Sequence, residues 1–199
     1  MKGKIRISKK SEYEDDNMIH GNDYAFFHRP VHLAVPPRWY QFLISSATRC
    51  VDIWDPYFNY NLDNNHDDCR VFRYLNNSVR FRYLVVEGDV QFENDFQKWE
   101  PVIASNIPSS LKAGMEISFS YISEGDELGK LWVFHDRFLI IDNERVFLIG
   151  GSLGYHLSSI ASTGIYELKD SDDKALVKDM FETYWTFSKK QNHVKKIAL

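Results

Sequence analysis

Cysteine is scarce in this chain of 199 residues, which contains only Cys50 and Cys69. Cys50 stands at the edge of an apolar segment and Cys69 in a polar one, so the sequence does not predict a disulfide framework. An apolar run near the ~18 residues that span a bilayer is also lacking, and the first residues, MKGKIRISKKSEYEDDN, have no apolar centre of the secretory type. We therefore expect a cytoplasmic protein with no transmembrane segment and at most a peripheral contact to anionic lipid.

A surplus of basic charge is missing as well. The chain has 24 lysines and arginines against 28 aspartates and glutamates, and its formal net charge is -4. This balance gives no general reason to expect a polyanionic partner. The basic ends KGKIRISKK and KKQNHVKK are of a kind that contacts nucleic acid or anionic lipid in some proteins and is simply solvated in most.

Hydrophobic residues, in contrast, make up 44% of the chain, which suffices for the core of one domain. Apolar runs predict strands at CVDIWDPYF, SVRFRYLVVEG, EISFSYIS, LWVFHDRFLIID and RVFLIG. Helical spacing predicts helices in PPRWYQFLISSA, around Val71 and Tyr74, in FENDFQKWEPVIASNI and in DDKALVKDMFETYWTF. Because strands alternate with helices early and form a hairpin late, turning at Asn143 and Glu144, we expect an α/β fold with a mixed β-sheet flanked by helices.

The expected domain comprises residues 34–190. Residues 1–33 are expected to form an N-terminal arm or an edge segment, with a short edge strand at IRIS, and residues 191–199 a basic C-terminal tail. Within the last helix an apolar stripe is predicted to face the core. Its members are Leu176, Val177, Met180, Phe181, Tyr184 and Trp185.

The stretch HDRFLIID, residues 135–142, places a histidine and an arginine two positions apart in an apolar strand. Side chains alternate along a strand, so His135 and Arg137 are predicted to project on one face. Imidazole acts as a nucleophile or general acid/base near neutral pH, and a guanidinium offers forked donors to phosphate oxygens. Each feature alone is also typical of a solvated strand end, but together they indicate a phosphate site.

The strand that follows ends in Gly150, Gly151 and Ser152. Two glycines permit close approach of the backbone, and the serine hydroxyl can bond an anion, although the same sequence also forms ordinary turns. The predicted hairpin brings this turn beside His135.

The order HDRFLIID and then GGS resembles the HxKxxxxD signature and trailing Gly-Ser of the phospholipase D superfamily, and residues from Ala34 to the last helix resemble its α/β unit. The resemblance implies a phosphodiesterase that needs no metal or other cofactor. His135 would attack phosphorus to form a phosphohistidine, and His135 of the partner subunit would protonate the leaving oxygen. Members with one motif per chain form homodimers, so a homodimer is implied here.

The resemblance also implies roles for other residues. Arg137 takes the place of the family lysine and, with Ser152, stabilises charge on the non-bridging oxygens. Asp142 has the opposite strand parity and is assigned to holding the turn or the dimer arrangement. Thr163 stands near the place of an acidic residue that orients the nucleophilic histidine, with Glu167 displaced along the same face.

Further residues complete the expected substrate-binding set, in which Gly150, Gly151 and Thr163 are joined by Asp55, Tyr57 and His156. The segment Asp55-Pro56-Tyr57 resembles a stretch at the end of the family's first strand, and it either lines the cleft or forms a structural turn. Two other histidine clusters, HRPVH at residues 28–32 and HDDC at residues 66–69, are better explained as loops than as metal sites.

Two functions remain open. One is a metal-independent phosphodiesterase, with nucleic acid favoured over lipid because the chain is short, carries one motif and has no lipid-entry segment. The other is a catalytically degenerate domain that binds phosphorylated ligands, anionic lipid or protein partners. Arg137 and Gly154 favour this second function, since enzymes of the family carry lysine and asparagine at these places.

Overall fold

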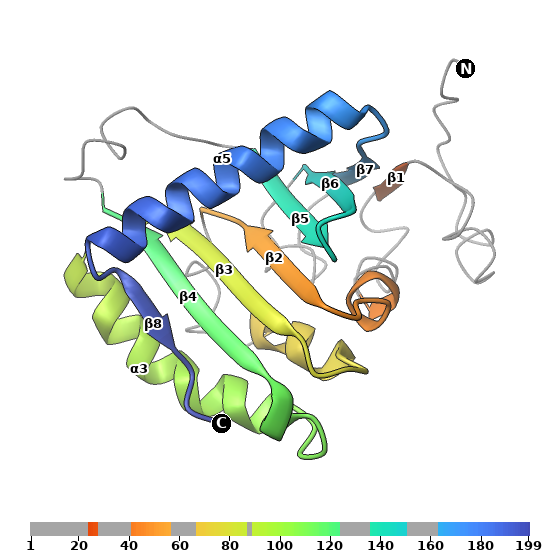
Figure 1. Cartoon of the computed structure of the whole chain (residues 1–199). Helices are drawn as coiled ribbons and strands as arrows, with labels where there is room; N and C mark the ends of the chain where they lie inside the picture. The colour runs from red at the N-terminus through yellow and green to blue at the C-terminus, as the bar shows by residue number, and fades with distance from the viewer. Residues whose placement is uncertain (1–23, 28–40, 57–66, 87–88, 124–135, 151–162) are drawn as a thin grey trace.

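The computed structural model describes residues 24–27, 41–56, 67–86, 89–123, 136–150 and 163–199. Among these residues, eight strands form one mixed sheet in the order β1-β7-β6-β5-β2-β3-β4-β8 (Figure 1). They are β1 Tyr24–Phe27, β2 Cys50–Trp54, β3 Arg80–Val86, β4 Glu116–Ile122, β5 Arg137–Ile141, β6 Arg145–Ile149, β7 Thr163–Glu167 and β8 Val194–Lys196. The pairs β2–β3 and β3–β4 are parallel and the others antiparallel, which confirms the predicted mixed sheet.

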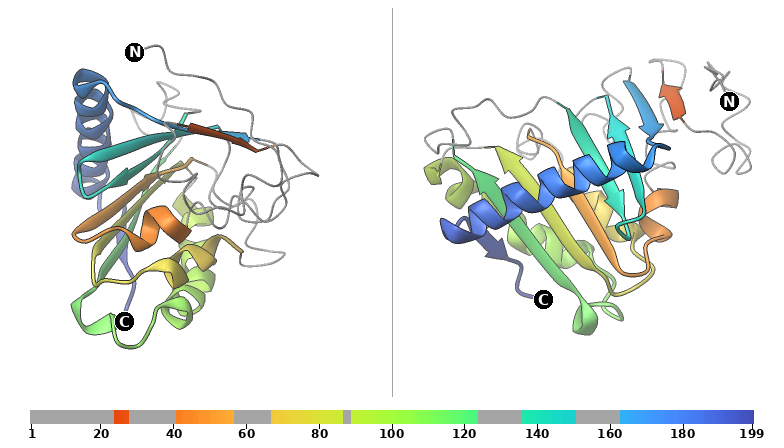
Figure 2. Two further views of the ribbon diagram at one scale, coloured as in Figure 1. Left: turned by 90° about the vertical axis from the view of Figure 1, so that its right-hand side faces the viewer. Right: turned by 45° about the horizontal axis from the view of Figure 1, so that its top comes forward.

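Helices cover both faces of the sheet (Figure 2). The long helix α5, Ser171–Lys190, crosses one face, which we call the α5 face. On the other, the α3 face, lie the short helix of residues 41–45, the 3-10 helix η3 at Asp67–Tyr74 and the helix α3 at Asp89–Asn106. The short 3-10 helix η4, Lys112–Gly114, leads from α3 into β4. Pro101, predicted to begin or kink its helix, lies inside α3 on the exposed side.

Alternating residues of the central strands point to opposite faces. In β3, Phe81 and Tyr83 belong to the core beneath α3, whereas Leu84 belongs to the core beneath α5. The α3 face has the larger core, and the α5 face a smaller one that includes Trp54 and Phe181. This parity also fixes the face of every polar residue on these strands.

The helix α5 begins at the N-cap Asp170, whose carboxylate accepts the backbone N–H of Asp172 at 2.8 Å and of Asp173 at 3.2 Å. Its buried residues follow helical spacing: Val177, Phe181, Trp185 and Ser188. Leu176 was predicted to lie on this stripe but is 59% exposed, because the buried line runs through residues one and five positions further on. The predicted apolar stripe therefore included one residue that is exposed.

Both edge strands fall in segments that the sequence analysis placed outside the domain. β1 lies in residues 1–33, expected to be an N-terminal arm or an edge segment, and it forms an edge strand that pairs with β7, Phe27 opposite Thr163. β8 lies in the expected basic tail, yet it pairs with β4, Lys196 opposite Ser118. The expected strand at IRIS and residues 131–135 of the predicted strand LWVFHDRFLIID lie outside the described residues.

The strand β8 was not predicted because two of its three residues are lysines, which are usually solvated. In the structure, Lys195 forms an ion pair with Glu93 and Lys196 with Glu116, each at 2.7 Å. Ile197, which follows directly, is buried against the α3 side of the core. An edge strand with charged side chains is a common way to protect a sheet from pairing with other chains.

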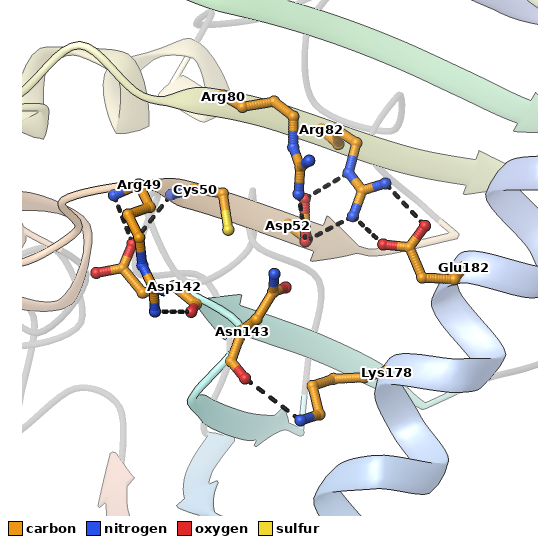
Figure 3. A network of polar contacts seen from close by, with 9 residues as sticks. All are labelled: Arg49, Cys50, Asp52, Arg80, Arg82, Asp142, Asn143, Lys178 and Glu182. Atoms are coloured by element: carbon orange, nitrogen blue, oxygen red, sulfur yellow. Dashed lines mark hydrogen bonds and ion pairs between the residues drawn. The ribbon is translucent and has the colours of Figure 1, made fainter.

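A partly buried ion network joins α5 to the sheet (Figure 3). Arg82 holds both carboxylate oxygens of Asp52, at 2.7 and 2.9 Å, and both oxygens of Glu182 on α5, at 3.1 and 2.5 Å. Burial alone would lower the pKa of Arg82, but the hydrogen bonds from Asp52 and Glu182 outweigh it and raise that pKa. Because Asp52 and Arg82 point to the α5 face, this network fixes α5 and lies away from the residues that share the parity of Arg137.

Candidate functional site

Strand β5 begins with Arg137 of the HDRFLIID motif. β5 runs antiparallel to β2, with Phe138 opposite Trp54. Arg137 therefore lies at the edge of the sheet where the parallel strands β2, β3 and β4 end, which we call the carboxyl edge. Because Leu139 and Ile141 belong to the core beneath α3, the alternation of the strand directs Arg137 to the α3 face.

At this edge Arg137 forms an ion pair with Asp55, with 3.5 Å between Arg137 Nε and Asp55 Oδ1. The Asp55 side chain is only 2% exposed and that of Arg137 is 18% exposed. Tyr83 of β3 donates its hydroxyl to Asp55 Oδ2 at 3.4 Å, and the backbone N–H of Asp55 donates to Leu84 O at 3.1 Å. A buried carboxylate is thus held at the end of β2 and faces the guanidinium of the motif.

Two more expected site residues lie at the same edge. Ile149 pairs with Arg137, so Gly150, which follows it, stands where β6 leaves the sheet beside the start of β5. Ile165 pairs in turn with Ile149, so Thr163, the first residue of β7, also lies at the carboxyl edge. The structure brings Asp55, Arg137, Gly150 and Thr163 to one edge.

Glu167 lies at the opposite end of β7 from Thr163. It accepts from Arg145 Nε and from Lys169 Nζ, at 2.9 Å each. Burial raises the pKa of Glu167, and its hydrogen bonds with Arg145 and Lys169 lower it below the ordinary glutamate value. Glu167 is therefore engaged by Arg145 and Lys169 at the level of Leu139, two residues from the level of Arg137 in the sheet register. His135, Tyr57, Gly151, Ser152 and His156 lie outside the described residues.

The last residue of the motif, Asp142, lies at the other edge of the sheet, which we call the amino edge (Figure 3). Its carboxylate accepts the backbone N–H groups of Thr48, Arg49 and Cys50 at 2.7 to 3.1 Å, and the Thr48 hydroxyl at 2.9 Å. The backbone adds two bonds, from Asp142 N to Cys50 O at 2.9 Å and from Arg49 Nη2 to Asp142 O at 2.6 Å. Asp142 therefore ties the β5–β6 turn to the start of β2.

The backbone conformation of the β5–β6 turn explains why aspartate and asparagine occupy its central positions. Glu144 N donates to Ile141 O at 3.0 Å, and Asp142 and Asn143 have φ angles of 55° and 59°. Positive φ at both central positions is the pattern of a type I′ hairpin turn, which aspartate and asparagine tolerate best after glycine. Burial raises the pKa of Asp142, but the donors from Cys50, Arg49 and Thr48 outweigh it and lower that pKa below the ordinary aspartate value.

Other reactive groups are few among the described residues. In that part of the chain no group of three or more histidine, cysteine, aspartate or glutamate side chains is placed to hold a metal ion. Burial, followed by the charge of Asp52, raises the pKa of the Cys50 thiol, which makes it a poor nucleophile. None of the described helices is long and apolar enough to cross a membrane.

Sequence reasoning missed two partners of the motif. Asp55 was expected to line a cleft or to form a turn, and its pairing with Arg137 was not predicted. The available signal was parity, since Asp55 continues the alternation of Val51 and Ile53 toward the α3 face. The Thr48 to Cys50 backbone that receives Asp142 had no signal, because backbone N–H groups carry no sequence identity.

Comparisons with known proteins agree with the fold. No protein-family model matches the chain, and no curated protein sequence does. Among solved structures, NucT from Helicobacter pylori is similar with a TM-score of 0.50 and 14% identity, over 82% of this chain and 95% of NucT. Nuc from Salmonella typhimurium, a phospholipase D family member, is similar with a TM-score of 0.47 and 12% identity, over 87% of this chain and 96% of Nuc.

The archaeal chromatin protein TrmBL2, whose structure shows a mode of DNA binding, is similar with a TM-score of 0.45 and 16% identity. That match covers 77% of this chain but only 49% of TrmBL2, so the chain spans about half the length of that protein. At such low identities the similarities concern the fold. The predicted α/β fold with a mixed sheet flanked by helices is confirmed.

Proposed function

We propose that this chain is a phospholipase D-like phosphodiesterase whose active site lies at the carboxyl edge of the sheet. The observation that supports this most directly is that Arg137, Asp55 and Gly150 meet at that edge. Arg137 follows His135 by two residues in the sequence. Open α/β sheets bind their ligands outside the carboxyl ends of the strands. The motif residues that lie inside the described part of the chain thus begin where a ligand is expected.

In the proposed reaction, a ring nitrogen of His135 attacks phosphorus, and a phosphorus–nitrogen bond forms as the bond to the leaving oxygen breaks. His135 of the partner subunit gives its proton to that oxygen and then activates a water molecule, which hydrolyses the phosphohistidine. Arg137 and Ser152 stabilise the charge on the non-bridging oxygens. We propose nucleic acid as the substrate, a homodimer as the active form, and no metal in the reaction.

A second function is favoured by one specific contact. Arg137 stands where the family enzymes carry lysine, and it is paired with the buried Asp55. A planar guanidinium held by a carboxylate is suited to bind a phosphate by forked hydrogen bonds, whereas a compact ammonium fits between two histidines. This pairing is what a domain that binds phosphorylated ligands without cleaving them would also need.

The experiment that separates these functions is cleavage of labelled single-stranded and double-stranded DNA, RNA and a short-chain phospholipid in EDTA. We expect nucleic acid to be cleaved by the wild type and cleavage to fall by more than about 1,000-fold in His135→Ala, as for loss of a nucleophile. The control is His193→Gln, because His193 stacks on Tyr121 beside β8 rather than lying near β5.

Two results are decisive. Cleavage that survives in His135→Ala would contradict the nucleophile. No cleavage by the wild type, with oligonucleotide or liposome binding that drops in Arg137→Ala, would support the binding domain instead. Activities are compared at a temperature at which thermal unfolding shows every variant to be folded.

A further inference from the structure

We infer that Asp55 is a positioning residue for Arg137: the buried carboxylate sets the orientation in which the guanidinium meets a phosphate. The inference rests on the proposed function, because it assumes a phosphate at the carboxyl edge. It goes beyond that function by giving Asp55 a role that involves no contact with the substrate.

The first support is the rigidity of Asp55. Its backbone is fixed by the bond from Asp55 N to Leu84 O, one oxygen receives the Tyr83 hydroxyl, and the following Pro56 is buried. Tyr83 in turn stacks on Phe119 with 5.5 Å between ring centroids. A carboxylate enclosed in this way cannot follow a moving arginine, so the arginine must adapt to the carboxylate.

The second support is energetic. A carboxylate that is 2% exposed is strongly unfavourable unless a cation or several donors compensate it. Arg137 provides a positive charge at 3.5 Å from Asp55 Oδ1. The attraction that stabilises Asp55 therefore also restricts the rotamers of Arg137. Arg137 is thus oriented in the free protein, before a ligand binds.

The third support comes from an internal comparison on the same strand. Asp52 is also buried, but it points to the α5 face and is held by Arg82 through two short bonds at 2.7 and 2.9 Å. Arg82 is further saturated by Glu182. Arg137 Nε and Asp55 Oδ1 are 3.5 Å apart, longer than these two bonds, so the two buried carboxylates of β2 hold their arginines in different ways.

A positioning role and a purely electrostatic role predict opposite effects. If Asp55 only offset the charge of Arg137, its neutralisation would strengthen phosphate binding, because an anion near the site would be removed. If Asp55 positions Arg137, its neutralisation weakens binding despite that gain. Asp55→Asn separates the two, since it keeps the size of the side chain and one oxygen but removes the charge.

The test uses the full chain with Asp55→Asn, Arg137→Ala and the double variant. Hydrolysis of bis(p-nitrophenyl) phosphate in EDTA gives kcat and KM, and fluorescence anisotropy gives the affinity for a single-stranded oligonucleotide. The matched control is Asp52→Asn, which removes an equally buried carboxylate from the same strand on the other face. Tyr83→Phe is a milder second variant, which keeps the stacked ring and removes only the hydroxyl at Asp55.

We expect Asp55→Asn to lower kcat/KM, and oligonucleotide affinity, by about 10-fold or more, the scale of one misplaced charge-assisted contact. In the Arg137→Ala background Asp55→Asn should have no further effect, because a positioning residue acts only through its partner. Tyr83→Phe should give a smaller loss in the same direction. Asp52→Asn should lower thermal stability and leave kcat/KM and affinity within about 2-fold of the wild type.

Equal or tighter binding in both Asp55→Asn and Tyr83→Phe would overturn the inference and leave the proposed function intact. Additive losses in the double variant of Asp55→Asn and Arg137→Ala would do the same. If the wild type binds but does not cleave, the affinities alone decide by the same criteria. If the wild type neither cleaves nor binds any of these phosphodiesters, the proposed function fails and the inference is overturned with it.

Discussion

The two ends of β5 carry the two ends of one motif, yet their surroundings differ. At the amino edge, Asp142 accepts bonds from three successive backbone N–H groups and a hydroxyl, all at 3.1 Å or less. At the carboxyl edge, Arg137 faces one buried carboxylate at 3.5 Å. Backbone donors around Asp142 at one end and a charge pair of Arg137 with Asp55 at the other indicate that the motif anchors the strand at Asp142 and presents chemistry at Arg137.

This difference teaches how a short motif should be interpreted. Spacing alone suggests that all its polar residues serve one site. Four residues of extended strand, 138–141, separate Arg137 from Asp142, so the two side chains lie at opposite edges of the sheet and cannot act on one small ligand. The aspartate of the motif is thus a structural residue by its contacts, and loss of either end should have a different effect.

The largest expected effect is on stability, from Asp142→Ala. The change leaves the N–H groups of Thr48, Arg49 and Cys50 without their acceptor and places alanine at positive φ, so we expect a loss of about 3 kcal/mol in the free energy of unfolding. Urea unfolding measures this value. Asp142→Asn is the control, which should lose less because asparagine tolerates this φ and keeps one acceptor oxygen.

The catalytic rate per folded molecule should remain unchanged in Asp142→Asn at temperatures well below its unfolding midpoint. A large fall in kcat without loss of stability would break the comparison, because it would place Asp142 in the site.

A smaller effect is expected at the other end, from Arg137→Lys. Lysine keeps the charge but loses the fork and the contact through Nε, so we expect kcat/KM or phosphate affinity to fall about 10-fold, or about 1.4 kcal/mol. Lys169→Arg, a conservative exchange beside Glu167 at the far end of β7, is the matched control and should change neither quantity. Higher activity in Arg137→Lys would mean that the arginine reduces catalysis and that this end has been retained for binding.

The smallest effect is the pH dependence of the amino edge. The folded-state pKa of Asp142 is lowered, so its contribution to stability is fully present above the unfolded value of about 3.9 and is lost as the pH falls through the lower folded value. The stability difference between the wild type and Asp142→Asn should therefore narrow from pH 6 to about pH 3 in urea unfolding. A difference that stays constant over this range would show that the charge of Asp142 contributes nothing.

Much of the fold followed from the sequence, because the apolar residues of β2 to β6, α3 and α5 repeat with clear periods. The positions of β1 and β8 were not predicted, because a strand of three or four residues at the edge of a sheet has too few alternating positions to be recognised. In β8, Lys195 and Lys196 also resemble solvated charged residues. The misplacement of Leu176 has a similar cause, since neighbouring apolar positions on a helix cannot both lie at the centre of the buried line.

The candidate site was predictable in part. The order of histidine, arginine and Gly-Gly-Ser pointed to phosphate chemistry, and strand parity pointed to a shared face. Pairing between residues distant in sequence could not be predicted: Asp55 meets Arg137 only because β2 and β5 are neighbours in the sheet. The donors to Asp142 could not be predicted either, since they are mainly backbone N–H groups, which nearly every residue has.

The central claim is that ligand binds at the carboxyl edge and not at the amino edge. Hydrogen–deuterium exchange of His135→Ala, with and without a saturating single-stranded oligonucleotide, tests it most directly, because the substrate stays uncleaved. The account predicts slower exchange on binding around residues 54–56, 136–138 and 149–150, with residues 47–50 and 141–145 unchanged. Protection at residues 47–50 and 141–145, with none at the carboxyl edge, would contradict it.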